Sequence, residues 1–481
     1  MDLKKIIVLV ILFVLAGYSS AFAVEDAQFS RSVEIKDGAS LSMIDCIAVA
    51  FKNSPKVKQK KYQLDIAQSN VGIAKSQYFP VISVGAGFYN ENNSDSGYYN
   101  SHYRELPTVA LAVNKLVWNF GKTTAYIKME EFYKIGAEYE FMDSLCNTIF
   151  DVKLRYYELL RAKALLKVAQ ENVNLNEKFL TLAKNKEKSD LKTAELNLSA
   201  AKIDLIEAKN NYKNSILDMN NTMYIETKAN YTLKDTPTFS SKFNLDSENL
   251  KLNDFSSVKF PFEAENAVEL AYQNSPDLNV LVSTKHAMEQ SLLFIKRTYL
   301  PDLNVDAKYG FNNSNYSANN SLQVGVNLSS SVNLMELKHS IKGAKAQLNL
   351  ADNEIDLFKK NLYFEVKKSL NNCEKTQNQI AITKMKVLQA DENLKAVEDK
   401  YTTGELNYIA LQDARKDYIN SLETYVSNIY DYNIALIKLE MAMHYHLVDI
   451  HHKSKHAVHY HSTELIEHIN EVLDCDEAEE K

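Results

Sequence analysis

The strongest fold signal in this sequence is the stretch Tyr299-Leu300-Pro301-Asp302-Leu303-Asn304-Val305-Asp306-Ala307-Lys308-Tyr309-Gly310-Phe311. After Asp302, every second side chain is apolar, and the residues between them are polar or glycine. This period of two predicts a strand with one apolar and one polar face. A polar loop follows, and the alternation returns over 322–329. We predict a hairpin of strands about ten residues long, as tilted transmembrane strands need, although a half-buried soluble hairpin has the same pattern.

The same unit occurs earlier in the chain, which favours the membrane interpretation. Six residues recur 221 positions later without a gap, with Ala50, Asn53, Ser54, Pro55, Tyr78 and Pro80 matching Ala271, Asn274, Ser275, Pro276, Tyr299 and Pro301. Alternating apolar residues follow Pro80, and a partner strand is predicted over 108–117. The chain therefore reads as two copies of one unit, each with two helices, a hairpin and further long helices.

Long tracts without helix breakers follow each hairpin. No proline lies between Pro107 and Pro237 or after Pro301, and Gly404 is the only glycine after Gly343. We predict helices over 122–184, 190–221, 336–401 and 405–446. Apolar residues in them recur at steps of three and four, which is typical of coiled-coil packing. Helices alone would equally fit a long antiparallel coiled coil with no transport role.

Composition and the repeat divide the chain into six parts. We predict a signal peptide over 1–23, an extended segment over 24–40, a first repeat over 41–221 with its hairpin at 81–118, a linker over 222–262, a second repeat over 263–446 with its hairpin at 302–332, and a histidine-rich, acidic tail over 447–481. The net charge of −7 gives no electrostatic footprint for nucleic acid. The four cysteines fit no zinc or redox spacing.

Taken together, these features resemble the TolC family of outer-membrane efflux and secretion channels. The resemblance covers about residues 40–446 and rests on the repeated Ala-x-x-Asn-Ser-Pro, the proline before each hairpin, and the turn and helix over 404–415. It implies an α+β membrane protein in the cell outer membrane, with most of the chain in the periplasm. It also implies a homotrimer with a twelve-stranded barrel on a long helical tunnel, a periplasmic adaptor and an inner-membrane transporter.

The implied function is that of an outer-membrane channel subunit of a tripartite efflux pump or type I secretion system. Physical reasoning supports oligomerisation, because four strands per chain cannot close a barrel with a lumen in outer-membrane lipid. The alternative is a periplasmic coiled-coil adaptor or structural protein without a pore. No catalytic motif or cofactor motif is found, so we expect no enzyme activity and no cofactor.

Two groups of residues are candidates for the channel itself. The polar strand positions expected to line a wet lumen are Asp302, Asn304, Asp306, Lys308, Gln323 and Asn327. The periplasmic turns are expected to face the adaptor and close the aperture, with Ser189, Asp190, Glu398, Asp399, Lys400, Gly404, Glu405 and Arg415 as tip and gate residues. Ordinary surface pairing of these charges is the alternative.

The tail is the one segment with possible metal chemistry. Its histidines include His452, His456, His459 and His461, and neutral imidazole is a common ligand for divalent metals. A tail that chelates weakly without a defined site has the same composition. We state a divalent-metal site there as a hypothesis.

Overall fold

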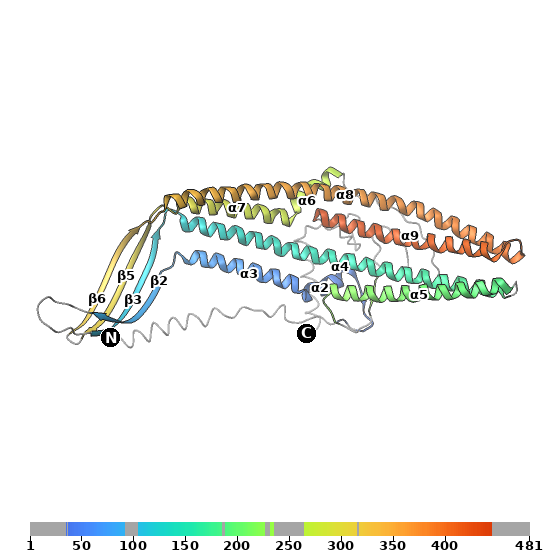
Figure 1. Cartoon of the computed structure of the whole chain (residues 1–481), viewed down its shortest axis with the longest axis horizontal. Coiled ribbons are helices and arrows are strands. Elements are labelled where there is room, and N and C mark those ends of the chain that lie inside the picture. Colours follow the sequence, from blue (N-terminus) through green and yellow to red (C-terminus); the bar gives the residue numbers. More distant parts are fainter. Residues whose placement is uncertain are drawn as a thin grey trace, which may run out of the picture.

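The computed structural model describes Ile35 and residues 37–91, 104–184, 188–226, 231–234, 264–314 and 317–444. The molecule is elongated, with a sheet at one end and long helices running away from it (Figure 1). Its elements are β1 (Ser40–Leu41), α2 (Met43–Asn53), α3 (Pro55–Ser76), β2 (Val81–Glu91), β3 (Arg104–Trp118), α4 (Lys122–Ala183), α5 (Lys188–Thr222), β4 (Thr232–Leu233), α6 (Ala264–Asn274), α7 (Pro276–Arg297), β5 (Asp302–Ser314), β6 (Ser317–Ser329), α8 (Leu334–Thr403) and α9 (Tyr408–Met443). The α+β class is confirmed.

The sheet joins one hairpin from each repeat. Its strand order is β2-β3-β5-β6, and every neighbouring pair is antiparallel. The two predicted hairpins are confirmed, with strands of 11 to 15 residues rather than about ten. A register shift between Leu116 and Trp118 marks a bulge near the helical end of β3. Such bulges increase local twist, which helps a sheet to curve.

The repeated Asn-Ser-Pro sequence ends one helix and starts the next in both halves. Ser54 and Ser275 are extended, with ψ of 115° and 113°, because a proline disfavours helical backbone at the residue before it. Each serine hydroxyl then caps the following helix by accepting a hydrogen bond, at 3.3 Å from the Val57 amide and 3.2 Å from the Leu278 amide. The proline at the first helical position has no amide proton that needs a partner.

The four long helices that the sequence predicts are confirmed. α4 has 62 residues and α8 has 70, so α8 extends about 105 Å at 1.5 Å per residue. α8 ends at Gly404, whose φ of +85° is the left-handed conformation expected of a helix-terminating glycine. α4 ends at Lys184 with helical dihedral angles and no glycine. α4 and α8, the corresponding helices of the two repeats, therefore end with different local geometry.

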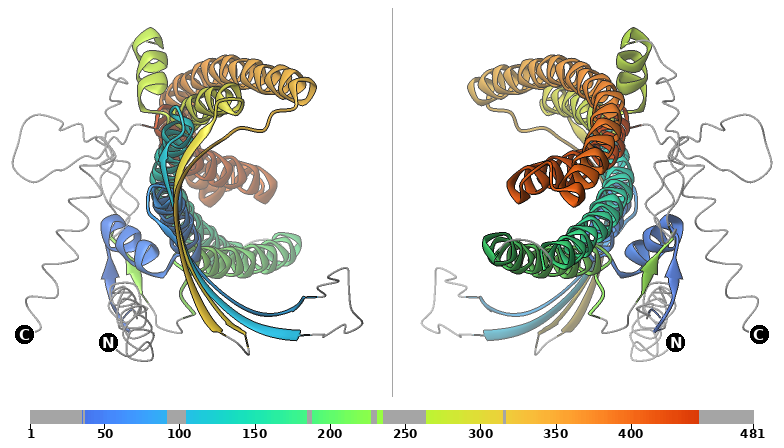
Figure 2. Two further views of the ribbon diagram at one scale, coloured as in Figure 1. Left: turned by 90° about the vertical axis from the view of Figure 1, so that its left-hand side faces the viewer. Right: turned by 90° about the vertical axis from the view of Figure 1, so that its right-hand side faces the viewer.

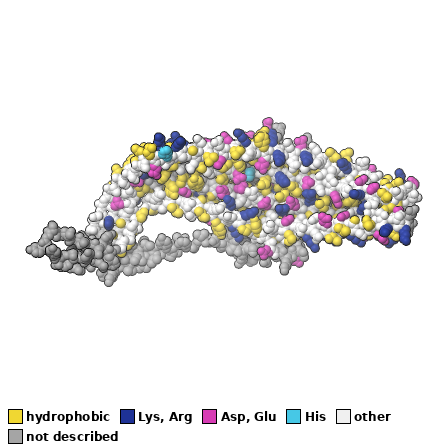
Figure 3. All heavy atoms as spheres, in the orientation of Figure 1, with side chains coloured by type: hydrophobic (Ala, Val, Ile, Leu, Met, Phe, Trp, Pro, Cys, Tyr) yellow, Lys and Arg dark blue, Asp and Glu magenta, His cyan; other side chains and the backbone are white. Residues whose placement is uncertain are grey.

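Viewed end-on, the helices form a curved wall and the sheet continues the curve (Figure 2). Basic and acidic side chains are interspersed over the helical body on the face that Figure 3 shows. Near the sheet, α4 packs between α3 and α7, and α7 packs on α8; near the tip, α4 packs between α5 and α9, and α9 packs on α8. The largest core cluster includes the buried Tyr156 and Ile149 of α4 and Leu422 and Tyr425 of α9. No helix in the described part of the chain is long and apolar enough to cross a membrane.

Candidate functional site

One face of the sheet is apolar across all four strands. The register places Ile82 beside Val113, Val113 beside Ala307, and Ala307 beside Val324. The next row runs through Val84, Leu111, Tyr309 and Leu322. The side chains in these rows are exposed on the surface of the chain, with Ile82 60% and Val324 69% exposed. A broad exposed apolar face on a sheet is typical of contact with lipid or with a partner.

The opposite face is polar or small. Asp302, Asn304, Asp306 and Lys308 alternate with the apolar positions of β5, and Gln323 and Asn327 lie beside Lys308 and Asn304 on β6. The structure thus brings all six candidate lumen residues to one face of the sheet. The Asn114 amide donates a hydrogen bond to the Asp306 carboxylate across β3 and β5. Asp302, at the base of the face, forms an ion pair with Lys122 Nζ at 2.6 Å.

Aromatic side chains gather where the strands meet the helices. Tyr78, Phe79, Trp118, Phe120 and Tyr299 are between 43% and 69% exposed there. The rings of Trp118 and Phe120 make an edge-to-face contact with centroids 6.2 Å apart. Exposed aromatic rings at one level beside an apolar sheet face are typical of the girdle at a membrane interface.

The same junction joins the two repeats. Arg297 Nη1, at the end of α7, donates to the Gly121 carbonyl at 2.9 Å, and Lys122 Nζ donates to the Leu300 carbonyl at 2.9 Å. Gly121 has φ of +80°, and a Cβ atom there would lie 2.6 Å from Arg297 Nη1. No local sequence pattern marks these residues, because their partners lie more than 170 positions away in the chain.

At the other end of the molecule, polar contacts join the helices near the two turns. Tyr401 Oη donates to Asp190 Oδ2 at 3.3 Å, which joins α8 to α5. The rings of Tyr401 and Tyr408 lie edge to face, with centroids 5.9 Å apart. Burial, followed by the nearby Asp190 charge, raises the pKa of Tyr401 to about 12, so this hydroxyl stays protonated at neutral pH. Glu398 forms an ion pair with Lys178 of α4.

Arg415 lies away from the turn charges with which the sequence analysis grouped it. It is 9% exposed, and its Nη1 donates to Asn172 Oδ1 of α4 at 2.8 Å. Burial lowers the pKa of Arg415. The four charges expected to form one latch therefore do not share a contact, since Glu398 and Arg415 each bind a different residue of α4. No sequence signal identified Asn172, Lys178 or Tyr401 as partners.

The remaining tip candidates lie in or beside the turns. The Glu405 amide donates to the Lys400 carbonyl at 2.9 Å, which closes the turn around Gly404. The Thr402 hydroxyl donates to the Asp399 carbonyl at 2.7 Å, and the Thr193 hydroxyl donates to the Ser189 carbonyl at 3.0 Å. These contacts are local, and the side chains of Asp399 and Ser189 are exposed at the surface.

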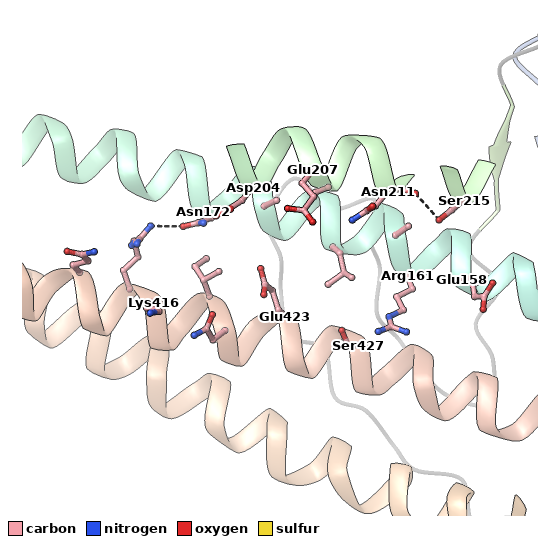
Figure 4. A pocket seen from close by; sticks show the side chains of 18 residues that line it. Glu158, Arg161, Asn172, Asp204, Glu207, Asn211, Ser215, Lys416, Glu423 and Ser427 are labelled. Atoms are coloured by element: carbon pink, nitrogen blue, oxygen red, sulfur yellow. Dashed lines mark hydrogen bonds between the residues drawn. The ribbon is translucent and has the colours of Figure 1, made fainter. Parts of the chain in front are cut away.

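A groove of about 880 Å³ runs between α5 and α9 over α4 (Figure 4). Glu207 from α5 and Glu423 from α9 point into it from opposite sides (Figure 4). Burial, followed by the Asp204 charge, raises the pKa of Glu423. No sequence signal marked this groove, because solvated carboxylates are common on helices and the approach of two of them from different helices is a tertiary property.

The metal hypothesis concerns residues outside the described chain. His452, His456, His459 and His461 all lie beyond residue 444. Within the described residues, no cluster of three or more His, Cys, Asp or Glu side chains is arranged to hold a metal ion. Burial raises the pKa of the Cys46 and Cys373 thiols to about 12, as expected for cysteines that pack in a core.

Comparisons with known proteins agree with this geometry. A family model described as "Outer membrane efflux protein" matches residues 46–221 and 267–443. The fold resembles the Campylobacter jejuni CmeC outer membrane channel, at 14% identity and a TM-score of 0.68 over 88% of this chain and 92% of that one. It also resembles the Vibrio cholerae outer membrane protein VceC, at 14% identity and a TM-score of 0.69 over 83% and 95%.

A third structure with this fold is the open state of the Neisseria gonorrhoeae MtrE outer membrane channel. It is 13% identical, with a TM-score of 0.68 over 88% of this chain and 95% of that one. No curated protein matches the sequence.

Proposed function

Because the chain belongs to the outer membrane efflux protein family, we propose that three copies of it close into one channel through which cargo leaves the cell. The chain is an outer-membrane efflux channel component, with its helical body in the periplasm. The observation that carries the proposal is the four-stranded sheet with one continuous apolar face and one polar face.

The sheet edges support closure with further copies. Within the described residues, β2 and β6 each pair with a neighbour on one side only. Unpaired backbone groups are unfavourable in lipid, so a membrane sheet must close into a barrel. Four strands per chain and three chains make a twelve-stranded barrel, in which β6 of one copy would pair with β2 of the next. The number three follows from the family resemblance.

The helices at the two edges of the wall carry matching apolar stripes. α8 follows one edge, and α3 and α5 follow the other (Figure 1). On α8, Leu350, Leu357 and Phe364 are spaced by seven and are between 57% and 68% exposed. On α5, Leu196 and Ile203 have the same spacing and are 69% and 65% exposed. We propose that α8 packs on the α3–α5 edge of the next copy, which buries both stripes.

In the closed barrel the polar sheet face lines the lumen. Asp302, Asn304, Asp306, Lys308, Gln323 and Asn327 would contact water there. We propose that transport through it is passive, with energy supplied by an inner-membrane transporter that a periplasmic adaptor connects to the tip. The turn residues Ser189, Asp399, Lys400, Gly404 and Glu405 would face that adaptor.

We further propose that the inter-helix contacts near the tip hold the channel closed. The Tyr401–Asp190, Glu398–Lys178 and Arg415–Asn172 contacts connect α8 and α9 to α4 and α5. Opening would require α8 and α9 to move away from the other pair, which breaks these three contacts. A pore-less adaptor, the alternative function, would not need the exposed apolar face of the sheet.

Reconstitution of the purified protein into planar bilayers tests the proposal. The expected results are discrete conductance steps and a chemically cross-linked species of three chains. Cysteines introduced on β2 and β6 should form disulfides between chains and not within one chain. A monomer that remains soluble without detergent and conducts no ions would contradict the proposal.

A further inference from the structure

A pocket of about 690 Å³ lies on the apolar face of the sheet, where β2 leaves α3. Tyr78, Pro80, Val113, Lys115, Val305 and Ala307 line it. The strand residues among them come from β3 and β5, the two central strands, so closure of the barrel through β2 and β6 would leave this pocket uncovered. Its walls are apolar except for the Lys115 ammonium and the Tyr78 hydroxyl.

Lys115 is a charged residue on an otherwise apolar surface. It lies beside Val305 in the register, and Val305 lies beside Val326, so the lysine belongs to the apolar face. Among the side chains described on this face, it alone is charged. It is exposed and forms no ion pair with any residue that the structure describes.

The neighbouring cations at this level do have partners. Lys122 binds the Asp302 carboxylate at 2.6 Å, and Arg297 binds the Gly121 carbonyl at 2.9 Å. The charge on Lys115 is therefore available to a ligand. The Tyr78 hydroxyl, which is 3.0 Å from Thr124 Oγ1, retains capacity for a second hydrogen bond.

The exposed aromatic rings of Tyr78, Trp118 and Tyr299 place this pocket at the level of a membrane interface. An ammonium group among these apolar side chains is stabilised by an anion at the interface, because the surrounding side chains and acyl chains cannot solvate its charge. A lipid phosphate supplies that anion, and its acyl chains cover the apolar walls. Free phosphate would satisfy the ammonium and leave the walls exposed.

We propose that this pocket binds one glycerophospholipid per chain, with the lipid phosphate at Lys115 Nζ and an acyl chain along Val113, Val305 and Ala307. The inference rests on the outer-membrane location of the sheet and on its apolar face contacting lipid. It does not depend on the export of any cargo. Bound lipid would fix the depth of the barrel at the point where the helices begin.

Native mass spectrometry of the full-length protein in detergent, titrated with phosphatidylethanolamine, tests the proposal. We expect one retained lipid per chain and a loss of affinity of about tenfold in Lys115→Gln, as for removal of one hydrogen bond to a charged group. Lys115→Arg should retain the lipid. Lys308→Gln is the matched control, because it removes a lysine from the opposite face of the same sheet and should leave binding unchanged.

Two further arms identify the ligand and the pocket. Ala307→Phe fills the pocket without changing its charge and should abolish retention. Diacylglycerol lacks the phosphate, so its affinity for the wild-type protein should be no higher than its affinity for Lys115→Gln. The proposal would be overturned if Lys115→Gln bound the lipid with wild-type affinity or if Ala307→Phe retained the lipid. It would also be overturned if millimolar inorganic phosphate displaced the lipid. Lipid binding that depends on Lys115 in a protein that conducts no ions would refute the channel and leave this inference standing.

Discussion

Lys153 of α4 and Glu440 of α9 form an ion pair 2.7 Å long between the two repeats, and each side chain is 7% exposed. They are 287 residues apart in the sequence. The pair lies beside the core cluster where α4 and α9 meet, far from the sheet and from the tip. The pair therefore belongs to the contact between the two repeats, and both charges are removed from the surface of the molecule.

Replacement of one partner of this pair should destabilise the protein strongly. Lys153→Met breaks this buried ion pair by removing one partner, which costs about 3–5 kcal/mol. The double variant with Glu440→Met should recover much of that loss, because neither charge is then buried. Thermal unfolding in detergent measures both. Lys395→Ala removes an exposed pair with Asp391 and should change stability by less than about 1 kcal/mol.

Loss of the contact between α8 and α5 should favour the open channel. Tyr401→Phe removes the hydroxyl that donates to Asp190 and keeps the ring packed on Tyr408. A hydrogen bond contributes about 1 kcal/mol, so the ratio of closed to open channels should fall about fivefold. Single-channel recording measures this ratio. Asp417→Asn, an exposed change on α9, is the control. An equal ratio of closed to open channels in the two variants would contradict a role of Tyr401 in gating.

We expect opening of the channel to depend on the charges in the groove between α5 and α9. Glu423 has a raised pKa because of its burial and of Asp204, so its ionised form is unfavourable in the closed arrangement. Glu423→Gln should therefore reduce the open probability at neutral pH, since it removes the repulsion across the groove. An acidic shift of the bath should have the same effect on wild type and little effect on the variant. A variant that opens more often would contradict this account.

Stability should rise as the pH falls through about 6, because Asp143 has a raised pKa in the folded chain. Burial, followed by the Asp277 charge, raises its pKa from 3.8 to about 6, and the Asn147 hydrogen bond and Lys60 oppose the shift. The folded protein therefore binds a proton that the unfolded chain lacks between these values, and protonation stabilises the fold. Melting temperatures between pH 5 and 8 should show this trend, and Asp143→Asn should flatten it. Asp151→Asn, an exposed change on the same helix, should preserve it.

Gly121→Ala should weaken the junction between sheet and helices. The backbone at Gly121 has φ of +80°, and the new methyl group would displace Arg297 Nη1 from its 2.9 Å hydrogen bond. Left-handed backbone costs a non-glycine residue roughly 1–2 kcal/mol, to which the lost contact adds. The yield of heat-stable oligomer measures the effect. Gly325→Ala is the control, because a Cβ atom there meets open space.

The divalent-metal site in the histidine-rich tail stays a prediction. Its test is calorimetry with Zn²⁺ on the full chain and on a variant that ends at residue 446. A difference between them at a Kd tighter than about 100 µM would support a site, and identical isotherms would contradict it.

Much of the architecture could be predicted from local patterns. The alternation after Pro80 and Pro301 identified the hairpins, and the scarcity of proline and glycine identified the four long helices, because these signals depend on residues close in sequence. The turn at the end of α8 could also be predicted, because Gly404 is a local signal for the left-handed backbone that ends a helix. The sequence grouped Arg415 with the charges of the turn, whereas the structure places it against Asn172 of α4. Proximity in the sequence does not show that an arginine is buried against a neighbouring helix.

The sequence by itself determined the period of each element, the duplication and the two-faced strands, since backbone geometry and side-chain alternation act over a few residues. Only the tertiary structure decided that β3 and β5 pair, that Lys153 faces Glu440 and that Lys115 lines an apolar pocket. Each of these depends on which segments meet across 170 or more residues of chain. That choice is made by the packing of whole faces against one another, and no single stretch of the sequence contains it.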